Sequence, residues 1–378
     1  MLAFRLFPFV QALIIIFCFI YPLKHINSIF KWVIGAILAV FSLKIYFFIF
    51  TNGTMMDPMF PRTTSFIIDC LYFSTIFVFL LTLVRMGANG LYKLVRFDRH
   101  KFVIPPSSVR YAFIILLVSF SLGTFGVING FATPVDKNYT IKIENLNEKA
   151  HGFVIVHLTD LHISSPATEK EVDDIVNRTN AKNPDLILIT GDLLDGTIEN
   201  LDHLTKKLFN LKAKYGVYAV SGNHEYYSGY YEWIYYFNQG GIHFLENENQ
   251  TIKADDGTAL FNLVGISDVS GEKLGFRGDD IPLATKDLDK SIPTIFMSHQ
   301  PKVADDIKEV SDLTLSGHTH GGLMPGLKIL VAAANKGYVS GYYRIGKEQL
   351  IVGNGTRIWA GAPLRLNTPS ELITITLE

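Results

Sequence analysis

The 378-residue sequence has little charge and almost no cysteine. Charged residues make up 18% of the chain, against about 25% in an average soluble domain, while apolar residues make up 48%. This composition excludes a disordered chain, a collagen and a coiled coil. Two cysteines also exclude a small scaffold held together by disulfides. The length predicts about two domains.

The near-neutral net charge of −1 conceals two unlike parts. Residues 1–135 contain eleven Lys or Arg and three Asp or Glu, whereas the remaining residues contain 23 basic and 32 acidic groups. Nine of the eleven histidines lie in the second part, while Cys18 and Cys70 both lie in the first. The sequence therefore predicts a basic, apolar N-terminal domain over 1–135, followed by an acidic, histidine-rich domain.

Four apolar runs in the first part approach the ~20 residues needed to cross a bilayer. They predict an all-α transmembrane domain of about four helices, with three as the main alternative because the first run is short and contains Pro8 and Gln11. A cleavable signal peptide would explain only the first run. Lys44 is expected to snorkel towards the interface and Asp69 to lie near a helix end. The expected helices cover about residues 6–23, 32–50, 66–84 and 111–133.

Basic residues in the short loops favour one orientation in the membrane. The loop between the third and fourth helices is expected to contain Arg85, Lys93, Arg96, Arg99, Lys101 and Arg110. The loop before it has only Arg62, with Asp57. Because basic loops stay in the cytoplasm, both termini should be extracytoplasmic, although Arg5 counts against this. We expect a multi-pass protein of the cell membrane with an extracytoplasmic C-terminal domain, and no nucleic-acid partner.

After a linker and an entering strand expected over 136–150, short apolar strands alternate with helices. The runs 153–158 and 185–190 are typical of buried strands, and Thr168 is expected to cap the helix between them. The tail, from Gly341 onward, is expected to form antiparallel strands. This alternation predicts an α/β domain over 151–378, in which layered sheets are flanked by helices.

Five of the expected strands end in clusters of Asp, His and Asn, and such strand ends are where α/β sheets assemble their sites. These residue types suit divalent metal ions. Seven such side chains are more than one ion needs, and two ions sharing a bridging carboxylate would use all of them. A pair of ions lowers the pKa of a water molecule bound between them and binds the oxygens of phosphate esters. The candidate ligands are Asp160, His162, Asp192, Asn223, His299, His318 and His320.

In this order the clusters resemble the signature of the calcineurin-like metallophosphoesterases. The motifs D-x-H, G-D-x-x-D-G, G-N-H-E, a lone His and G-H-T-H occur at Asp160–His162, Gly191–Gly196, Gly222–Glu225, His299 and Gly317–His320. The ending from Asn354 to Leu372 looks like that of the membrane-associated subgroup, which acts on lipid- or envelope-linked phosphates. The resemblance covers about residues 150–378.

The resemblance also implies a role for each motif residue. Asp160, His162 and His320 would hold one metal ion, and Asn223, His299 and His318 the other, with Asp192 bridging both. His224 would be catalytic rather than a ligand, stabilising charge on the phosphoryl group or protonating the leaving oxygen, with Asp195 orienting it. The implied cofactors are two divalent ions per chain, drawn from Mn, Fe, Zn or Mg.

Together these features predict a membrane-anchored two-metal phosphoesterase. It would hydrolyse a phosphomonoester, phosphodiester or pyrophosphate, with lipid- or envelope-linked substrates favoured. One alternative is a pyrophosphatase on the cytoplasmic face that acts on a nucleotide-linked lipid. Another is a membrane sensor or transport component that binds metal without catalysis.

Several residues near the motifs have competing interpretations. His157, inside an expected strand, is expected to be structural. The segment 226–237 is expected to pack an aromatic helix face on the sheet, with an interfacial, substrate-admitting rim as the alternative. Arg357 and Arg365 are expected to form surface salt bridges rather than phosphate contacts.

Overall fold

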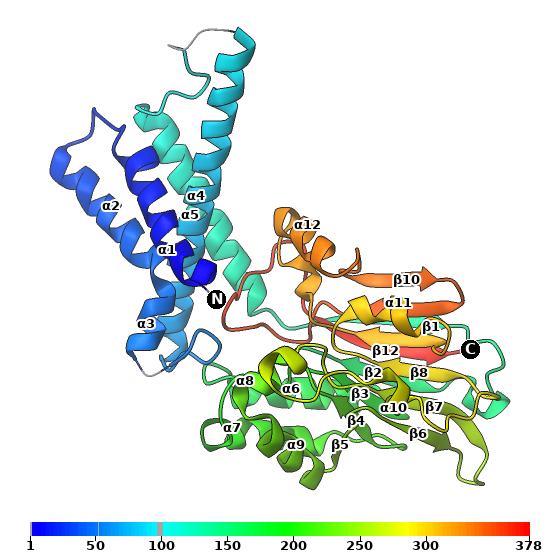
Figure 1. Cartoon of the computed structure of the whole chain (residues 1–378). Helices are drawn as coiled ribbons and strands as arrows, with labels where there is room; N and C mark the ends of the chain where they lie inside the picture. The colour runs from blue at the N-terminus through cyan, green and yellow to red at the C-terminus, as the bar shows by residue number, and fades with distance from the viewer. Residues whose placement is uncertain (1, 52, 97–100) are drawn as a thin grey trace. The chain divides into compact units, whose positions relative to one another are not determined.

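The computed structural model describes residues 2–51, 53–96 and 101–378 (Figure 1). The chain divides into two compact units, Met1–Asn129 and Gly130–Glu378. Arg99, one of the basic residues used to predict membrane orientation, lies outside the described residues.

The first unit is helical along all four of the predicted apolar runs. Its elements are α1 (Leu2–Ile14), which continues into the π-helix η1 (Ile15–Ile20), α2 (Ser28–Ser42), α3 (Lys44–Phe50), α4 (Arg62–Arg96) and α5 (Val109–Gly130). Helices α4 and α5 are long and apolar enough to cross a membrane, and α2 and α3 make a third candidate if the pair, bent by 62°, is one span. The described residues therefore give two candidate spans, or three, and the prediction of about four is supported only in part.

Lys44 and Asp69 do not occupy the positions expected of them. Lys44 Nζ forms an ion pair with Asp69 Oδ1, and the two side chains are only 2% and 4% exposed. Lys44 is the first residue of α3, while Asp69 lies inside α4. The snorkelling prediction is wrong because each charge is buried against the other, which offsets the cost of removing it from water.

Helix α4 is longer than the third apolar run predicts. It has 35 residues and continues to Arg96, so that Arg85 and Lys93 lie in a helix rather than a loop. Arg85 is buried and donates a hydrogen bond to the Cys18 carbonyl. At 1.5 Å per residue the helix is about 52 Å long, which exceeds the ~30 Å hydrocarbon core of a bilayer. One part of α4 therefore extends beyond a membrane that it spans.

The second unit is built on two six-stranded sheets. The first has the order β1-β12-β2-β3-β4-β5, formed by Val135–Ile141, Glu371–Leu377, Val154–Leu158, Leu186–Thr190, Val217–Val220 and Ile242–Phe244. The second has the order β10-β11-β9-β8-β7-β6, formed by Gly341–Ile345, Glu348–Val352, Leu313–Ser316, Thr294–Met297, Ala259–Gly265 and Glu248–Lys253. Strands β2 to β5 are parallel, as are β7, β8, β9 and β11.

The inner strands β2, β3, β4, β8 and β9 are buried and largely apolar because both faces of the sheets are covered there. The edge strands β1, β6 and β10 carry polar and exposed residues instead. The inner faces share one core, in which Ile155 of β2 and Leu263 of β7 both take part. Helices α6 (Glu169–Asn180), α7 (Ile198–Thr205) and α9 (Tyr230–Gln239) pack on the outer face of the first sheet (Figure 1). Helices α10 (Ile281–Ala284) and α11 (Ala304–Ile307) are close to the outer face of the second. The predicted layered α/β architecture is confirmed.

Local signals also predicted where some elements begin. Helix α6 starts after Thr168, whose side chain accepts a hydrogen bond from the Glu171 backbone while Glu171 bonds back to the cap. The expected linker over 136–150 contains most of β1, which pairs in parallel with β12. Since β12 also runs antiparallel to β2, the end of the chain closes the first sheet next to the strand that leads to Asp160.

Candidate metal centre

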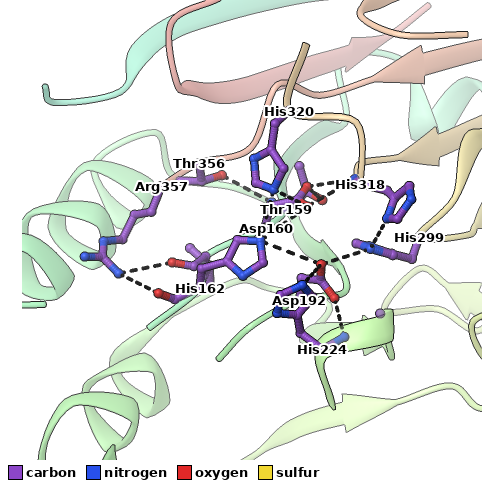
Figure 2. A network of polar contacts seen from close by, with 12 residues as sticks. Thr159, Asp160, His162, Asp192, His224, His299, His318, His320, Thr356 and Arg357 are labelled. Carbon is purple, nitrogen blue, oxygen red and sulfur yellow. Dashed lines mark hydrogen bonds and ion pairs between the residues drawn. The ribbon is translucent and has the colours of Figure 1, made fainter. Parts of the chain in front are cut away.

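The predicted ligands follow the carboxyl ends of five strands. All of them except Asn223 are labelled in Figure 2, where they lie together. Asp160 and His162 follow β2, Asp192 follows β3, Asn223 follows β4, His299 follows β8, and His318 and His320 follow β9. Two groups have ligand atoms within 4.8 Å of one another: Asp160, His162 and His320, and Asp192, His299 and His318. A third group joins Asp192 of the second group to His162 of the first and to His224, so Asp192 links the two groups.

Ring nitrogens face each other in this cluster. His162 Nε2 is 3.1 Å from His320 Nε2, and His318 Nδ1 is 3.2 Å from His299 Nε2. Two neutral imidazoles can meet this way only if one nitrogen carries a proton or if both face a cation. Asp192 Oδ2 also lies 3.2 Å from His299 Nε2. The mixture of imidazole nitrogens and carboxylate oxygens is the donor set that binds divalent transition metals.

Asn223 supplies a further sign that a cation fits here. Its Oδ1 is buried and has no hydrogen-bond partner among the described residues. A buried amide oxygen without a partner is costly, and a metal ion would satisfy it. The next backbone N–H, that of His224, donates to Asp192 Oδ1 at 2.8 Å, which places Asn223 beside the predicted bridge. The residues present therefore fit the two divalent ions that the motifs imply.

Hydrogen bonds fix which nitrogen two of the histidines turn towards the centre. His299 Nδ1 donates to the Thr190 carbonyl at 2.7 Å, and His162 Nδ1 lies 2.9 Å from Asp195 Oδ2. In each ring the lone pair of Nε2 can then coordinate a metal ion. Such partners orient ligands and select their tautomer.

The ligand loops have an unusual backbone. Positive φ angles are uncommon outside glycine and cost energy, and they concentrate at functional sites. Five of the seven candidate ligands have them: Asp160 (50°), His162 (41°), Asp192 (53°), His318 (69°) and His320 (48°). Contacts with the rest of the domain therefore stabilise these residues in a backbone conformation that is unfavourable for an isolated segment.

Two motif glycines allow the loops to approach one another. A Cβ at Gly222 would lie 2.2 Å from Asp192 Oδ1, and one at Gly317 would lie 2.3 Å from Asp160 Oδ2. Both distances are shorter than any real contact, so any other residue would displace a candidate ligand. The loops therefore approach each other closely at both glycines.

His224 and Asp195 lie together beside the ligands. His224 Nδ1 is hydrogen-bonded to Asp195 Oδ1, and His224 Nε2 is 3.9 Å from Asp192 Oδ2. Burial lowers the pKa of His224, but the carboxylates of Asp192 and Asp195 outweigh burial and raise that pKa above its ordinary value. Asp195 also binds His162, so one carboxylate contacts both a candidate ligand and the candidate catalytic histidine.

Comparison with known proteins agrees with this geometry. Residues 153–322 match the family model for calcineurin-like phosphoesterases. A Helicobacter pylori protein named as an uncharacterized metallophosphoesterase is 33% identical over 337 residues, which cover 87% of this chain and 85% of that protein. The chain belongs to the calcineurin-like metallophosphoesterases.

Further relatives of this metallophosphoesterase include membrane proteins. A Danio rerio protein named as a transmembrane protein with metallophosphoesterase domain is 29% identical over 282 residues, covering 73% of this chain and 64% of that protein. Among solved structures, a dimetal phosphatase from Danio rerio aligns with a TM-score of 0.35 and 11% identity, covering 55% of this chain and 88% of that one.

Sequence reasoning gave no role to Glu225, although it is part of the G-N-H-E motif. Its buried carboxylate accepts hydrogen bonds from the backbone N–H groups of Asp192, Leu193 and Gly222, at 3.0, 2.7 and 2.6 Å. Glu225 thus ties the loop after β3 to the loop after β4. The available signal was its position directly after two candidate site residues, Asn223 and His224.

The expectation of surface salt bridges is wrong for Arg365 and holds only in part for Arg357, whose guanidinium lies 3.5 Å from the Glu171 carboxylate but is largely buried. Arg365 is 1% exposed, and its guanidinium donates to the carbonyls of His320 at 3.0 Å and Arg357 at 2.9 Å, among others. Arg357 is 8% exposed and donates to the carbonyls of Leu161 and His162, at 3.1 and 3.2 Å (Figure 2). Both arginines hold ligand loops from a segment beyond the family-model match.

The aromatic segment after the G-N-H-E motif divides between a buried and an exposed face. Trp233 and Phe237 are fully buried, and Trp233 Nε1 donates to the Gly196 carbonyl at 2.9 Å. Tyr231 and Tyr235 are 65% and 68% exposed. The prediction of an aromatic helix face packed on the sheet is confirmed for the buried side chains. His157 is also buried, with Nε2 2.8 Å from Thr190 Oγ1.

Two other aromatic rings flank His224. The Tyr227 ring centroid is 5.5 Å from that of His224, and the Trp359 centroid is 5.6 Å from it. Both rings are at least partly exposed. Sequence reasoning missed Trp359, because its position beside His224 depends on the fold of the last hundred residues.

Proposed function

We propose that this chain is a membrane-anchored two-metal phosphoesterase. Its substrate is a phosphomonoester, phosphodiester or pyrophosphate, and lipid- or envelope-linked phosphates are the favoured class. The observation that carries the proposal is the pair of three-residue ligand groups, Asp160 with His162 and His320, and Asp192 with His299 and His318. A single ion would not need both groups.

The ligand assignment follows the two groups. Asp160, His162 and His320 hold one ion, His299 and His318 hold the other together with Asn223, and Asp192 bridges them. Divalent ions bound there supply Lewis acidity towards a phosphoryl oxygen and activate water for attack.

His224 and Asp195 act beside the ions. The hydrogen bond from Nδ1 to Asp195 leaves His224 Nε2 facing the centre. The hydrogen bond to the Asp195 carboxylate favours the protonated ring, which can stabilise phosphoryl charge or give a proton to the leaving oxygen. Tyr227 and Trp359 flank this ring and are placed to contact the leaving group.

Membrane attachment and orientation rest on the first unit. Helices α4 and α5 supply two candidate spans, and we propose that α1 with η1 and the bent α2–α3 pair complete a multi-pass anchor. Lys93, Arg96, Lys101 and Arg110 lie between the apolar parts of α4 and α5, which favours a cytoplasmic location for this connection. The catalytic unit is then extracytoplasmic.

The proposal is tested with the purified full chain in detergent, loaded with Mn²⁺. We expect hydrolysis of bis-p-nitrophenyl phosphate or p-nitrophenyl phosphate that requires the added ion and is abolished by EDTA. A preparation that binds two ions per chain but hydrolyses neither ester would refute catalysis. It would support the non-catalytic metal-binding alternative instead.

Orientation is tested separately. Reporter enzymes fused after Glu378 should be active only when the reporter is one that functions outside the cytoplasm. Activity of a cytoplasm-specific reporter alone would overturn the extracytoplasmic assignment. It would favour the pyrophosphatase acting on a nucleotide-linked lipid, because such precursors are made inside the cell.

A further inference from the structure

Helix α12 (Pro325–Ala334) is apolar and yet lies on the surface of the catalytic unit. Its sequence, PGLKILVAAA, contains one charged residue, Lys328. All ten residues belong to the described part of the chain, and each is at least partly exposed. Ile329 and Leu330 are 73% and 67% exposed, more than any other large aliphatic side chain among the described residues of the second unit. A water-facing helix normally carries polar residues on its outer face.

The helix is too short to cross a bilayer. Ten residues rise about 15 Å, half of the ~30 Å hydrocarbon core. An exposed apolar helix of this length can instead lie in the plane of the interface, with its apolar side chains among the acyl chains and its charge at the head groups. Lys328 supplies that charge, and anionic lipid would attract it.

The start of α12 is fixed to the metal centre. The helix begins five residues after His320, and the Lys328 backbone N–H donates to the Met324 carbonyl. A Cβ at Gly322 would lie 2.7 Å from the Lys328 Cα, so α12 packs directly against the ligand loop. The Leu323 carbonyl accepts a hydrogen bond from the Leu366 N–H at 2.8 Å, next to Arg365. A surface that binds α12 is therefore close to His320 as well.

The short connection between α5 and β1 indicates which surface α12 contacts. Helix α5, a candidate membrane span, ends at Gly130, and β1 begins only five residues later at Val135. Such a connection extends less than about 20 Å, so the catalytic unit cannot leave the membrane surface once α5 is inserted. We propose that α12 is an interfacial helix that lies in the bilayer to which the chain is anchored. This inference rests on the proposed membrane attachment.

The consequence concerns the substrate. With α12 in the interface, the metal centre opens next to the head-group layer, and a phosphoester attached to a lipid can reach it without leaving the bilayer. A soluble ester reaches the same centre from water. Contact of α12 with lipid thus selects for membrane-embedded phosphoesters, whereas the chemistry at the metal ions is unchanged.

Fluorescence from a labelled full chain in liposomes tests this directly. After Cys18→Ala and Cys70→Ala, a nitrobenzoxadiazole label is attached through Leu330→Cys, with Glu309→Cys as the exposed control and Tyr235→Cys for the aromatic helix α9. We expect blue-shifted emission at 330 and quenching by bromolipids roughly twofold or more above that at 309. Water-like emission at 330, equal to that at 309, would overturn the proposal, and lipid quenching only at 235 would move the contact to α9.

Two further results separate this inference from others. Blue-shifted emission at 330 that bromolipids do not quench, and that disappears on dilution of the protein in lipid, would mean that α12 covers a second copy of the chain and would contradict a lipid contact. Failure of the chain to float with liposomes would refute the membrane anchor itself, and α12 with it. Since none of these readouts needs turnover, an inactive chain still reports the position of α12.

A double substitution gives a second measurement. Ile329→Gln with Leu330→Gln should lower hydrolysis of a phosphoester embedded in liposomes by roughly tenfold while leaving a soluble chromogenic ester unaffected. The matched control is Val310→Gln, a change at an exposed aliphatic residue on the same unit. Equal rates of the double variant and the wild type on the embedded ester would contradict the proposal.

Discussion

Replacing Arg365 by Met should destabilise the catalytic unit and empty one metal site. The guanidinium is buried and donates to the carbonyls of His320, Asn354 and Arg357, and Nη2 lies 3.2 Å from His320 Nδ1. Met fills a similar volume but donates nothing. Four backbone carbonyls, counting that of Thr368, would lose this donor, and the His320 ring would lose the contact at its Nδ1.

The magnitude follows from those bonds. A buried hydrogen bond to a charged group contributes about 1.5–3 kcal/mol, and part of the loss is recovered because a buried charge disappears. We therefore expect a net destabilisation of about 3 kcal/mol. For a unit of this size, each kcal/mol lowers the melting temperature by about 2–4 °C, which predicts a fall of roughly 6–12 °C.

Thermal unfolding and metal analysis of the purified full chain measure both effects. The metal content should fall from two ions towards one, because His320 belongs to only one ligand group. Arg344→Met is the matched control, since Arg344 is exposed on β10 and its loss should change stability by less than about 0.5 kcal/mol. If Arg365→Met melted within roughly 2 °C of the wild type and kept two ions, the positioning role would be refuted.

Three further variants test other parts of the account. Asp192→Ala should lose both ions by metal analysis, and full occupancy would contradict the bridge. His224→Ala should keep both ions but lose most of kcat, whereas loss of metal would make His224 a ligand. Burial raises the pKa of Glu348 to about 7, above the ~4.3 of a glutamate in the unfolded chain. The folded state therefore loses stability as the pH rises from ~4.3 towards 7, because the unfolded chain ionises first. Glu348→Gln should therefore raise the melting temperature at pH 8 and hardly at pH 4.5; equal gains at both would contradict this.

The local signals in the sequence predicted much of the catalytic unit. The apolar run before Asp160 predicted β2, and Thr168 predicted the start of α6. Motif order also indicated which side chains meet, because polar residues after parallel strands collect at one sheet edge. The structure brings those side chains within contact distance.

Other features depend on contacts between distant residues, and periodicity does not encode them. The break between α2 and α3 at Leu43 contains no glycine or proline that would predict it, and it lies next to the buried ion pair of Lys44 and Asp69. Arg365 follows the apolar run 358–364, and only the fold shows that carbonyls surround its guanidinium. The exposure of α12 is likewise a tertiary fact, because its composition alone suits a buried helix.

The central claim is that two metal ions together support phosphoester hydrolysis. The most direct test titrates the metal-free full chain with Mn²⁺ while bound metal and hydrolysis of bis-p-nitrophenyl phosphate are measured in the same samples. The account predicts saturation at two ions per chain, with hydrolysis rising as the second ion binds. Saturation at one ion, or hydrolysis that persists in EDTA, would contradict it.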